Sequence, residues 1–193
     1  MKNNNFNNRN GNIRRMAVTA LFAALSVVLT VLIRFPFPPA PFLEYDPADI
    51  PIFLLTFAYG PLWGLALTVV VSVVQGLTVS ASSGIIGIVM HIVATGLFVT
   101  VAGSIFRGER HSISRALIAL ICGVLAQTAA MVIMNLLLTP IFMGTPVSQV
   151  IPMLLPIIIP FNLMKAGINA AVTFVLYRQV GALINKKTVK TVL

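Results

Sequence analysis

The chain has 193 residues, of which 58% are hydrophobic and only 9% are charged. Soluble proteins carry about a quarter charged residues, so this composition excludes an ordinary soluble domain. Several uncharged apolar runs reach the ~20 residues that a helix needs to cross a hydrocarbon core of ~30 Å. The composition therefore predicts an all-α integral membrane protein that forms one bundle.

The net charge of +9 is concentrated beside the ends of the apolar runs. The three clusters are Lys2, Arg9, Arg14 and Arg15 before the first run, Arg107, Arg110 and Arg115 in one short connection, and Arg178, Lys186, Lys187 and Lys190 after the last run. Such clusters are typical of the positive-inside bias of membrane proteins rather than of a phosphate-binding surface. We therefore expect a lipid bilayer, and no nucleic acid, as a partner.

The N-terminal segment 1–13 is rich in asparagine, and we expect it to be a disordered cytosolic tail. Arg14 and Arg15 then precede an apolar run that is long and lacks a small-residue cleavage site, so we expect a first transmembrane helix rather than a signal peptide. Residues 14–185 are predicted to form the membrane domain, and residues 186–193 a basic cytosolic tail.

The spans are clear except in one region. Four apolar runs are expected to be single spans, at about 16–33, 84–106, 114–138 and 156–178. A single helix over 48–80 would be about 45 Å long, well beyond the bilayer core. The pair Gly60-Pro61 interrupts this region and predicts a turn, so we expect two helices there, at about 48–59 and 61–79.

Charge then decides the number of spans. A bundle of six transmembrane helices places both termini and the basic connection near 107–115 in the cytosol, as the positive-inside bias requires. Five spans would place that connection outside. The sequence therefore predicts six spans with both termini cytosolic.

The first span carries small residues, with Ala20 and Ala24 one helical turn apart. Small residues allow another helix to approach closely. Spacing alone supports two interpretations equally, a docking surface for another protein and packing within the bundle.

The connection after the first span reads RFPFPPAPFLEYDPADIP, residues 34–51. Its prolines predict an extended, semi-rigid chain that loses little entropy on ordering. Aromatic side chains, among them Phe42 and Tyr45, alternate with the prolines, so the connection is suited to close as a lid over a flat ligand. A rigid connector is the alternative. Asp49 is expected to cap the helix that follows.

The last span carries polar residues on one face, because Asn162, Lys165 and Asn169 follow i, i+3, i+7 spacing. Lys165 lies about 20 Å along the helix from Arg178, and so well inside the bilayer. A lysine at this depth costs about 2.5–3.5 kcal/mol, which predicts that it faces a polar cavity or a partner. The alternative is that it extends outward or caps carbonyls freed by the prolines upstream.

Other polar residues at membrane depth are less informative. Asn135 in the fifth span is a candidate binding residue, although interhelical hydrogen bonding would also explain it. For Gln75, His91 and Gln127 packing is the preferred interpretation. No P-loop or HExxH pattern occurs, and we expect no enzymatic activity, no metal site and no cofactor. A binding cavity without its own energy source indicates a subunit that another protein drives.

These features together resemble the riboflavin-specific S components of energy-coupling factor (ECF) vitamin transporters. The resemblance rests on FPFP and YDPADIP in the first connection, YGPLWG at 59–64, Asn135, and LPIIIPFNLMKAG at 155–167. It implies that 14–185 is the substrate-binding domain of an ABC-type transporter in a bacterial cell membrane. Riboflavin would be captured from outside and delivered through a transmembrane coupling (T) protein and two ATPase subunits.

The resemblance also implies roles for particular residues. Asn135, Asn162 and Lys165 would bind the vitamin, with the first connection closing over it. Ala20 and Ala24 would form the docking surface for the coupling protein. Asparagine amides and a lysine suit the donors and acceptors at the pyrimidine end of a flavin, whereas a phosphorylated flavin would call for more positive charge.

The sequence departs from the family pattern at three places. The third span reads TVVVSVVQG where members often carry an acid and a Lys-Asn pair, His91 stands where asparagine is common, and Glu44 where lysine is frequent. Another planar vitamin is therefore an alternative ligand. An autonomous secondary transporter or channel is a second alternative, and an intramembrane enzyme using Lys165 or His91 is disfavoured because acids are scarce.

Overall fold

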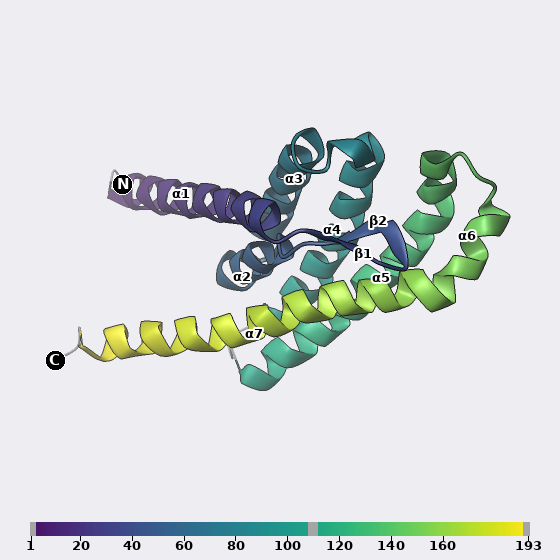
Figure 1. The fold of residues 1–193 in the computed structure, drawn as a ribbon. Helices are drawn as coiled ribbons and strands as arrows, with labels where there is room; N and C mark the ends of the chain where they lie inside the picture. Colours follow the sequence, from purple (N-terminus) through teal and green to yellow (C-terminus); the bar gives the residue numbers. More distant parts are fainter. Residues whose placement is uncertain (1–2, 108–111, 191–193) are drawn as a thin grey trace.

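The computed structural model describes residues 3–107 and 112–190, which form a helical bundle with one small hairpin (Figure 1). The helices are α1 (Asn3–Leu32), α2 (Asp49–Tyr59), α3 (Pro61–Leu77), α4 (Gly84–Phe106), α5 (Ile113–Met143), α6 (Val147–Met153) and α7 (Ile159–Lys190). The shorter elements are the strands β1 (Phe35–Phe37) and β2 (Ala40–Tyr45), the 3-10 turn η1 (Ala81–Ser83) and the π-helical turn η2 (Leu154–Ile158). Parts of the predicted tails (1–2 and 191–193) and of the basic connection (108–111) lie outside the described residues.

Several helices of the described chain are long and apolar enough to cross a membrane. These stretches are Asn12–Leu32, Ala81–Phe106, Ile113–Met143 and Val147–Tyr177, and α2 and α3 are apolar but shorter. The predicted all-α membrane class is therefore confirmed. α1 begins at Asn3, within the segment 1–13 for which we expected disorder, so the helix extends well beyond the apolar run that defines the first span.

The break expected at Gly60-Pro61 is confirmed. Gly60 has φ 92°, a left-handed conformation that favours glycine, and it ends α2. Pro61 then occupies the first turn of α3, where its missing N–H costs no hydrogen bond. This pair lets α2 fold back against α3 instead of continuing as one long helix.

The proline-rich connection is extended, as its composition predicts, and its two halves pair as a β-hairpin, which the composition did not predict. β1 and β2 pair antiparallel, with Phe35 opposite Tyr45, and the register shifts after Pro36. Pro36 is tolerated because a two-stranded sheet consists only of edge strands, where a residue without an N–H need not break a hydrogen bond between strands. The ring centroids of Phe35 and Tyr45 lie 5.0 Å apart, which adds a cross-strand contact.

The prolines before the last span do not end the helix. α6, η2 and α7 form one helical path from Val147 onward, so this span begins nine residues before the expected 156. The π-helical turn contains Pro156, and its wider winding accommodates a residue that cannot donate the usual hydrogen bond. α5 likewise continues through Pro140 to Met143, beyond the expected end at 138.

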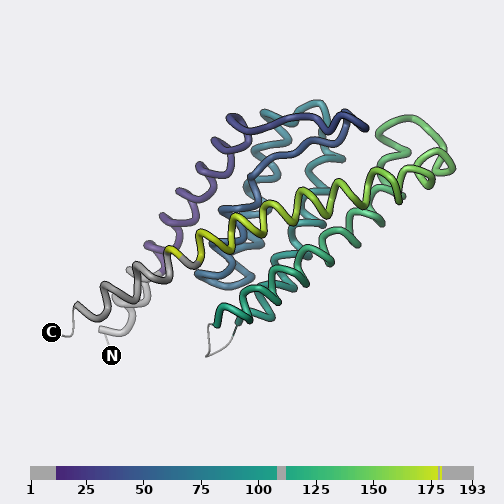
Figure 2. Tube along the Cα trace, turned by 60° about the horizontal axis from the view of Figure 1, so that its bottom comes forward, coloured from purple at the N-terminus to yellow at the C-terminus, as the bar shows by residue number. Residues whose placement is uncertain are grey.

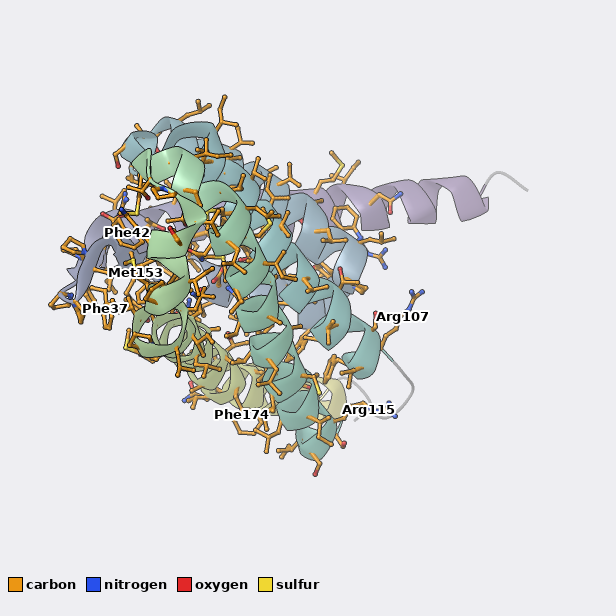
Figure 3. The ribbon with its side chains drawn as sticks, turned by 90° about the vertical axis from the view of Figure 1, so that its right-hand side faces the viewer. Phe37, Phe42, Arg107, Arg115, Met153 and Phe174 are labelled. Atoms are coloured by element: carbon orange, nitrogen blue, oxygen red, sulfur yellow. The ribbon has the colours of Figure 1, made fainter. Side chains whose placement is uncertain are left out.

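The two ends of the bundle differ. α1 starts and α7 ends on one side, whereas the hairpin and α6 lie toward the other (Figure 1). In Figure 2 the coloured part of α1 likewise leads toward the end of the bundle that holds the hairpin and α6. Arg107 and Arg115 lie at the opposite end of the molecule from Phe37, Phe42 and Met153 (Figure 3). The basic residues that flank the α4–α5 connection are thus far from the hairpin.

The core lies where α2, α3, α4 and α5 meet. Phe53 of α2 stacks on Phe98 of α4, with ring centroids 3.6 Å apart. Two glycines allow the helices to pack closely in this core. A Cβ on Gly123 would lie 2.8 Å from the Phe98 ring, and a Cβ on Gly64 would collide with the Thr56 hydroxyl.

Replacing Gly64 by valine is expected to destabilise the bundle by about 1–3 kcal/mol, because the added atoms would overpack the contact of α3 with α2 and α4. A Cβ at this position would also lie 2.7 Å from Val99 Cγ1. Thermal unfolding in detergent micelles would measure the change. Gly167→Val is the matched control, since a Cβ there meets no atom within 4 Å. Equal stability of the two variants would contradict this packing argument.

Candidate substrate-binding site

A cavity of about 170 Å³ lies between the hairpin segment (residues 35–46) and the helices α3, α4, α5 and α7. Its lining mixes apolar and polar side chains and includes Phe42, Asp46, His91, Asn135, Asn162 and Lys165. A concave, partly apolar site with a few convergent polar groups is the usual form of a small-molecule pocket. Because the lining comes from both ends of the chain, folding is required to assemble it.

Lys165 connects α7 to the hairpin segment. Its Nζ donates to Oδ2 of Asp46 at 2.6 Å and to the backbone oxygen of Glu44 at 3.2 Å. An ammonium has three N–H donors, so these two bonds leave one donor for the cavity that Lys165 lines. The carbonyl that Lys165 caps belongs to the hairpin and not to the proline-containing turn upstream.

Tyr45 and Asn169 lie behind the cavity wall and anchor the hairpin to α7. The Tyr45 hydroxyl donates to Oδ1 of Asn169 at 3.1 Å, and the Asn169 amide donates to the Asp46 carbonyl at 3.1 Å. Burial raises the pKa of the Tyr45 phenol above its usual value, and the Asp46 carboxylate raises it further, so the phenol retains its proton. Neither residue lines the cavity. Together they hold the backbone at Asp46 against α7.

The two other candidate asparagines line the cavity and are almost fully buried. Asn135 donates to the Met131 carbonyl at 2.7 Å, and Asn162 to the Ile158 carbonyl at 2.8 Å. Thr139 donates to Oδ1 of Asn135 at 2.8 Å. Each amide is therefore oriented by its own helix before any ligand arrives.

Asp49 does not cap α2, and that expectation was wrong. The N-cap residue is Ala48, and no side chain caps the helix. Asp49 is fully buried because this end of α2 packs inside the bundle. Its Oδ1 accepts from Thr95 at 3.0 Å and lies 3.0 Å from Nε2 of His91, and its Oδ2 lies 3.5 Å from Nε2 of Gln127.

Arg34 joins three segments at the hairpin end of the molecule. It follows α1, and its Nε donates to Oε2 of Glu44 at 2.9 Å. Its guanidinium also donates to the Val79 carbonyl, in the turn between α3 and η1. Since Glu44 lines the cavity, Arg34 links the cavity-lining strand of the hairpin to α1 and to the turn after α3.

The structure brings most of the candidate residues together. Phe42, Asn135, Asn162 and Lys165 line the cavity, with Tyr45 and Asn169 behind them. Ala20 and Ala24 are separate from this site and exposed on α1.

Sequence reasoning missed the acids as members of the site and assigned His91 to packing. Asp46 pairs with Lys165, and Asp49 pairs with His91. The sequence signals were the short spacing of Asp46 and Asp49 beside an apolar helix and a histidine, His91, at membrane depth. Such a pattern does not show which residues meet.

A membrane helix bundle with a hairpin at the edge of a small, partly apolar cavity has the form of a membrane protein that binds a small molecule. Residues 14–177 match the family described as ECF transporter, substrate-specific component, and the chain belongs to that family. Its members are transporter subunits, so this chain is a multi-pass membrane transport protein and not an enzyme.

Individual relatives are similar over most of their length. The riboflavin transporter FmnP of Bacillus subtilis is 30% identical over 84% of this chain and 88% of its own. The riboflavin transporter RibU of Staphylococcus aureus is 26% identical over 86% of this chain and 89% of its own. A solved S component of a bacterial ECF transporter superposes with a TM-score of 0.77 at 27% identity, covering 90% of this chain and 98% of that chain.

Proposed function

We propose that this S component captures riboflavin from outside the cell and delivers it through an ATPase-driven coupling module. The observation that carries the proposal is the cavity, with Asn135, Asn162 and Lys165 in its wall and the hairpin at its edge. The two relatives named as riboflavin transporters align over most of this chain and add support.

The chemistry of the cavity favours a flat, uncharged ligand. Phe42 and Phe161 supply apolar surface for an isoalloxazine ring, and the free donor of Lys165 and the two asparagine amides suit its pyrimidine carbonyls and N–H. A phosphorylated flavin fits less well, because Lys165 is already paired with Asp46 and Arg34 with Glu44. Another planar vitamin remains the alternative ligand.

The proposal includes six spans with both termini in the cytosol. Gly60-Pro61 divides α2 from α3, and the basic ends of α4 and α5 lie opposite the hairpin (Figure 3). The positive-inside bias then orients the hairpin outward, where a vitamin would enter. Residues 14–185 form the substrate-binding domain in this arrangement, flanked by cytosolic segments 1–13 and 186–193.

Energy would come from partners, a transmembrane coupling (T) protein and two ATPase subunits. Ala20 and Ala24 are proposed as the docking surface for the T protein. Both are exposed on α1, whereas Ser26 and Thr30 on the other face are buried against the bundle. Small exposed residues allow close helix–helix contact in a membrane.

Flavin fluorescence tests the proposed ligand directly. Riboflavin fluorescence should be quenched on titration with the purified protein, and thiamine should not compete. Absence of binding, together with a different vitamin found by mass spectrometry of co-purifying molecules, would reassign the ligand. Riboflavin uptake into liposomes that contain this protein alone, driven by an ion gradient, would favour the alternative of an autonomous transporter or channel.

Replacing Arg34 by alanine is expected to speed riboflavin release about tenfold, because the hairpin loses its ties to α1 and to the turn after α3. Stopped-flow fluorescence would measure the release rate. Arg14→Ala is the matched control, since Arg14 is exposed and lies far along α1 from the cavity. An unchanged release rate in the Arg34 variant would show that the hairpin does not retain the ligand.

A further inference from the structure

His91 links three helices beside the cavity. Its Nε2 lies 3.0 Å from Oδ1 of Asp49 on α2, and its Nδ1 lies 2.7 Å from Oγ of Ser72 on α3. Ser72 Oγ also lies 2.6 Å from the Thr68 carbonyl, one turn earlier in the same helix. His91 itself lines the cavity, and its side chain is 18% exposed.

Hydrogen-bond direction indicates where the protons lie. A backbone carbonyl only accepts, so the single proton of Ser72 is donated to Thr68, as serines in helices commonly do. Ser72 must then accept from Nδ1 of His91, which therefore carries a proton. Nε2 faces a carboxylate oxygen, which also requires a donor. Because Nδ1 of His91 already carries a proton, it cannot accept the proton of Ser72. This arrangement therefore excludes Ser72 as an activated nucleophile.

Charge balance points to the same protonation state. Asp49 is fully buried, and a buried carboxylate without a counter-charge is strongly destabilising. The remaining charges around the cavity are already matched, Lys165 with Asp46 and Arg34 with Glu44. With an imidazolium at His91, the described charges around the cavity form three neutral pairs.

We propose that His91 is a doubly protonated positioning residue that neutralises Asp49 and so keeps Lys165 available for Asp46 and the ligand. If His91 lost its charge, two carboxylates would face one ammonium, and the cavity would become net negative. A neutral vitamin would then compete with Asp49 for Lys165. The consequence for ligand affinity rests on the proposed function, but the protonation state of His91 does not.

Nitrogen NMR of the ligand-free protein tests the protonation state. With ¹⁵N-labelled histidine at neutral pH, both ring nitrogens of His91 should resonate at the positions of protonated imidazolium nitrogens. The chain contains one other histidine, His111, and the variant His111→Gln assigns the signals. A pyridine-type signal from either nitrogen of His91 would overturn the proposal, whatever ligand the protein binds.

Riboflavin affinity as a function of pH tests the positioning role. The groups that face His91 or share its cavity are Asp49, Asp46, Glu44 and Lys165. If the imidazolium of His91 gives up one of its two ring protons, Asp49 loses its counter-charge, so the proposal predicts that affinity falls as pH rises. His91→Gln should bind about tenfold more weakly at neutral pH, since Asp49 keeps its charge and loses its counter-charge.

The double variant Asp49→Asn/His91→Gln replaces the ion pair by two neutral amides. It should recover most of the riboflavin affinity at neutral pH. Its affinity should also fall less at high pH than that of the wild-type protein, because only a contribution from Lys165 remains. Unchanged affinity and an unchanged pH profile in His91→Gln would overturn the positioning role. If the single variant fails to fold, a double variant that folds but binds no better than background would overturn it as well.

Discussion

Replacing Lys165 by methionine is expected to weaken riboflavin binding about 10- to 100-fold. Methionine keeps most of the side-chain volume but removes the ammonium, so the ligand loses a charged donor and Asp46 loses its counter-charge. Isothermal titration or flavin quenching would measure the affinity. The effect should be the largest of any single substitution in the cavity wall, because Lys165 serves both the ligand and the hairpin.

Two further variants separate these two roles. Asp46→Asn/Lys165→Met removes the unpaired carboxylate, so any affinity that it recovers over Lys165→Met measures the cost of leaving Asp46 alone. Met164→Ala is the control, since Met164 is 37% exposed and is not part of the lining. Wild-type affinity in Lys165→Met would remove Lys165 from the ligand site.

Replacing Ala24 by tryptophan is expected to abolish vitamin uptake by cells while leaving riboflavin affinity unchanged. Ala24 is exposed on α1 and belongs to neither the core nor the cavity lining, so a large side chain there does not disturb the fold. It would, however, prevent the close approach of a partner helix. Uptake of radiolabelled riboflavin, measured beside binding to the purified variant, separates the two effects.

A bulky residue elsewhere on the bundle surface provides the comparison. Ile133 of α5 is 58% exposed, and Ile133→Trp should retain uptake. If Ala24→Trp transports normally, α1 does not dock through this face, although the ligand site would be unaffected. Loss of uptake in both variants would indicate a general defect in membrane insertion rather than a docking surface.

Two features of the structure show which parts of the fold the local sequence can predict. Gly60-Pro61 predicts the break between α2 and α3 correctly, because both residues act through their own backbone geometry. The connection after α1 is extended as expected, but its pairing as a hairpin was not predicted, because proline content describes the conformation of each residue and not its pairing. Pairing of Phe35 with Tyr45 depends on the turn between them and on the surface beneath.

The candidate site was likewise predictable in part from the local sequence. The spacing of Asn162, Lys165 and Asn169 places them on one face of a helix, and their position in an apolar run predicts a polar partner. The partner itself could not be predicted, because Asp46 lies 119 residues from Lys165 in the sequence. For the same reason Asp49 was expected to cap a helix end, whereas packing of α2 against α4 buries it beside His91.

The sequence by itself determined that the chain is a helical membrane protein of the S-component family, since hydropathy, turn residues and family motifs are all local properties. Only the tertiary structure decided which charges meet and which of the polar residues face the cavity. Inside a bilayer each buried charge requires a counter-charge, and that counter-charge comes from a distant segment that folding alone brings near.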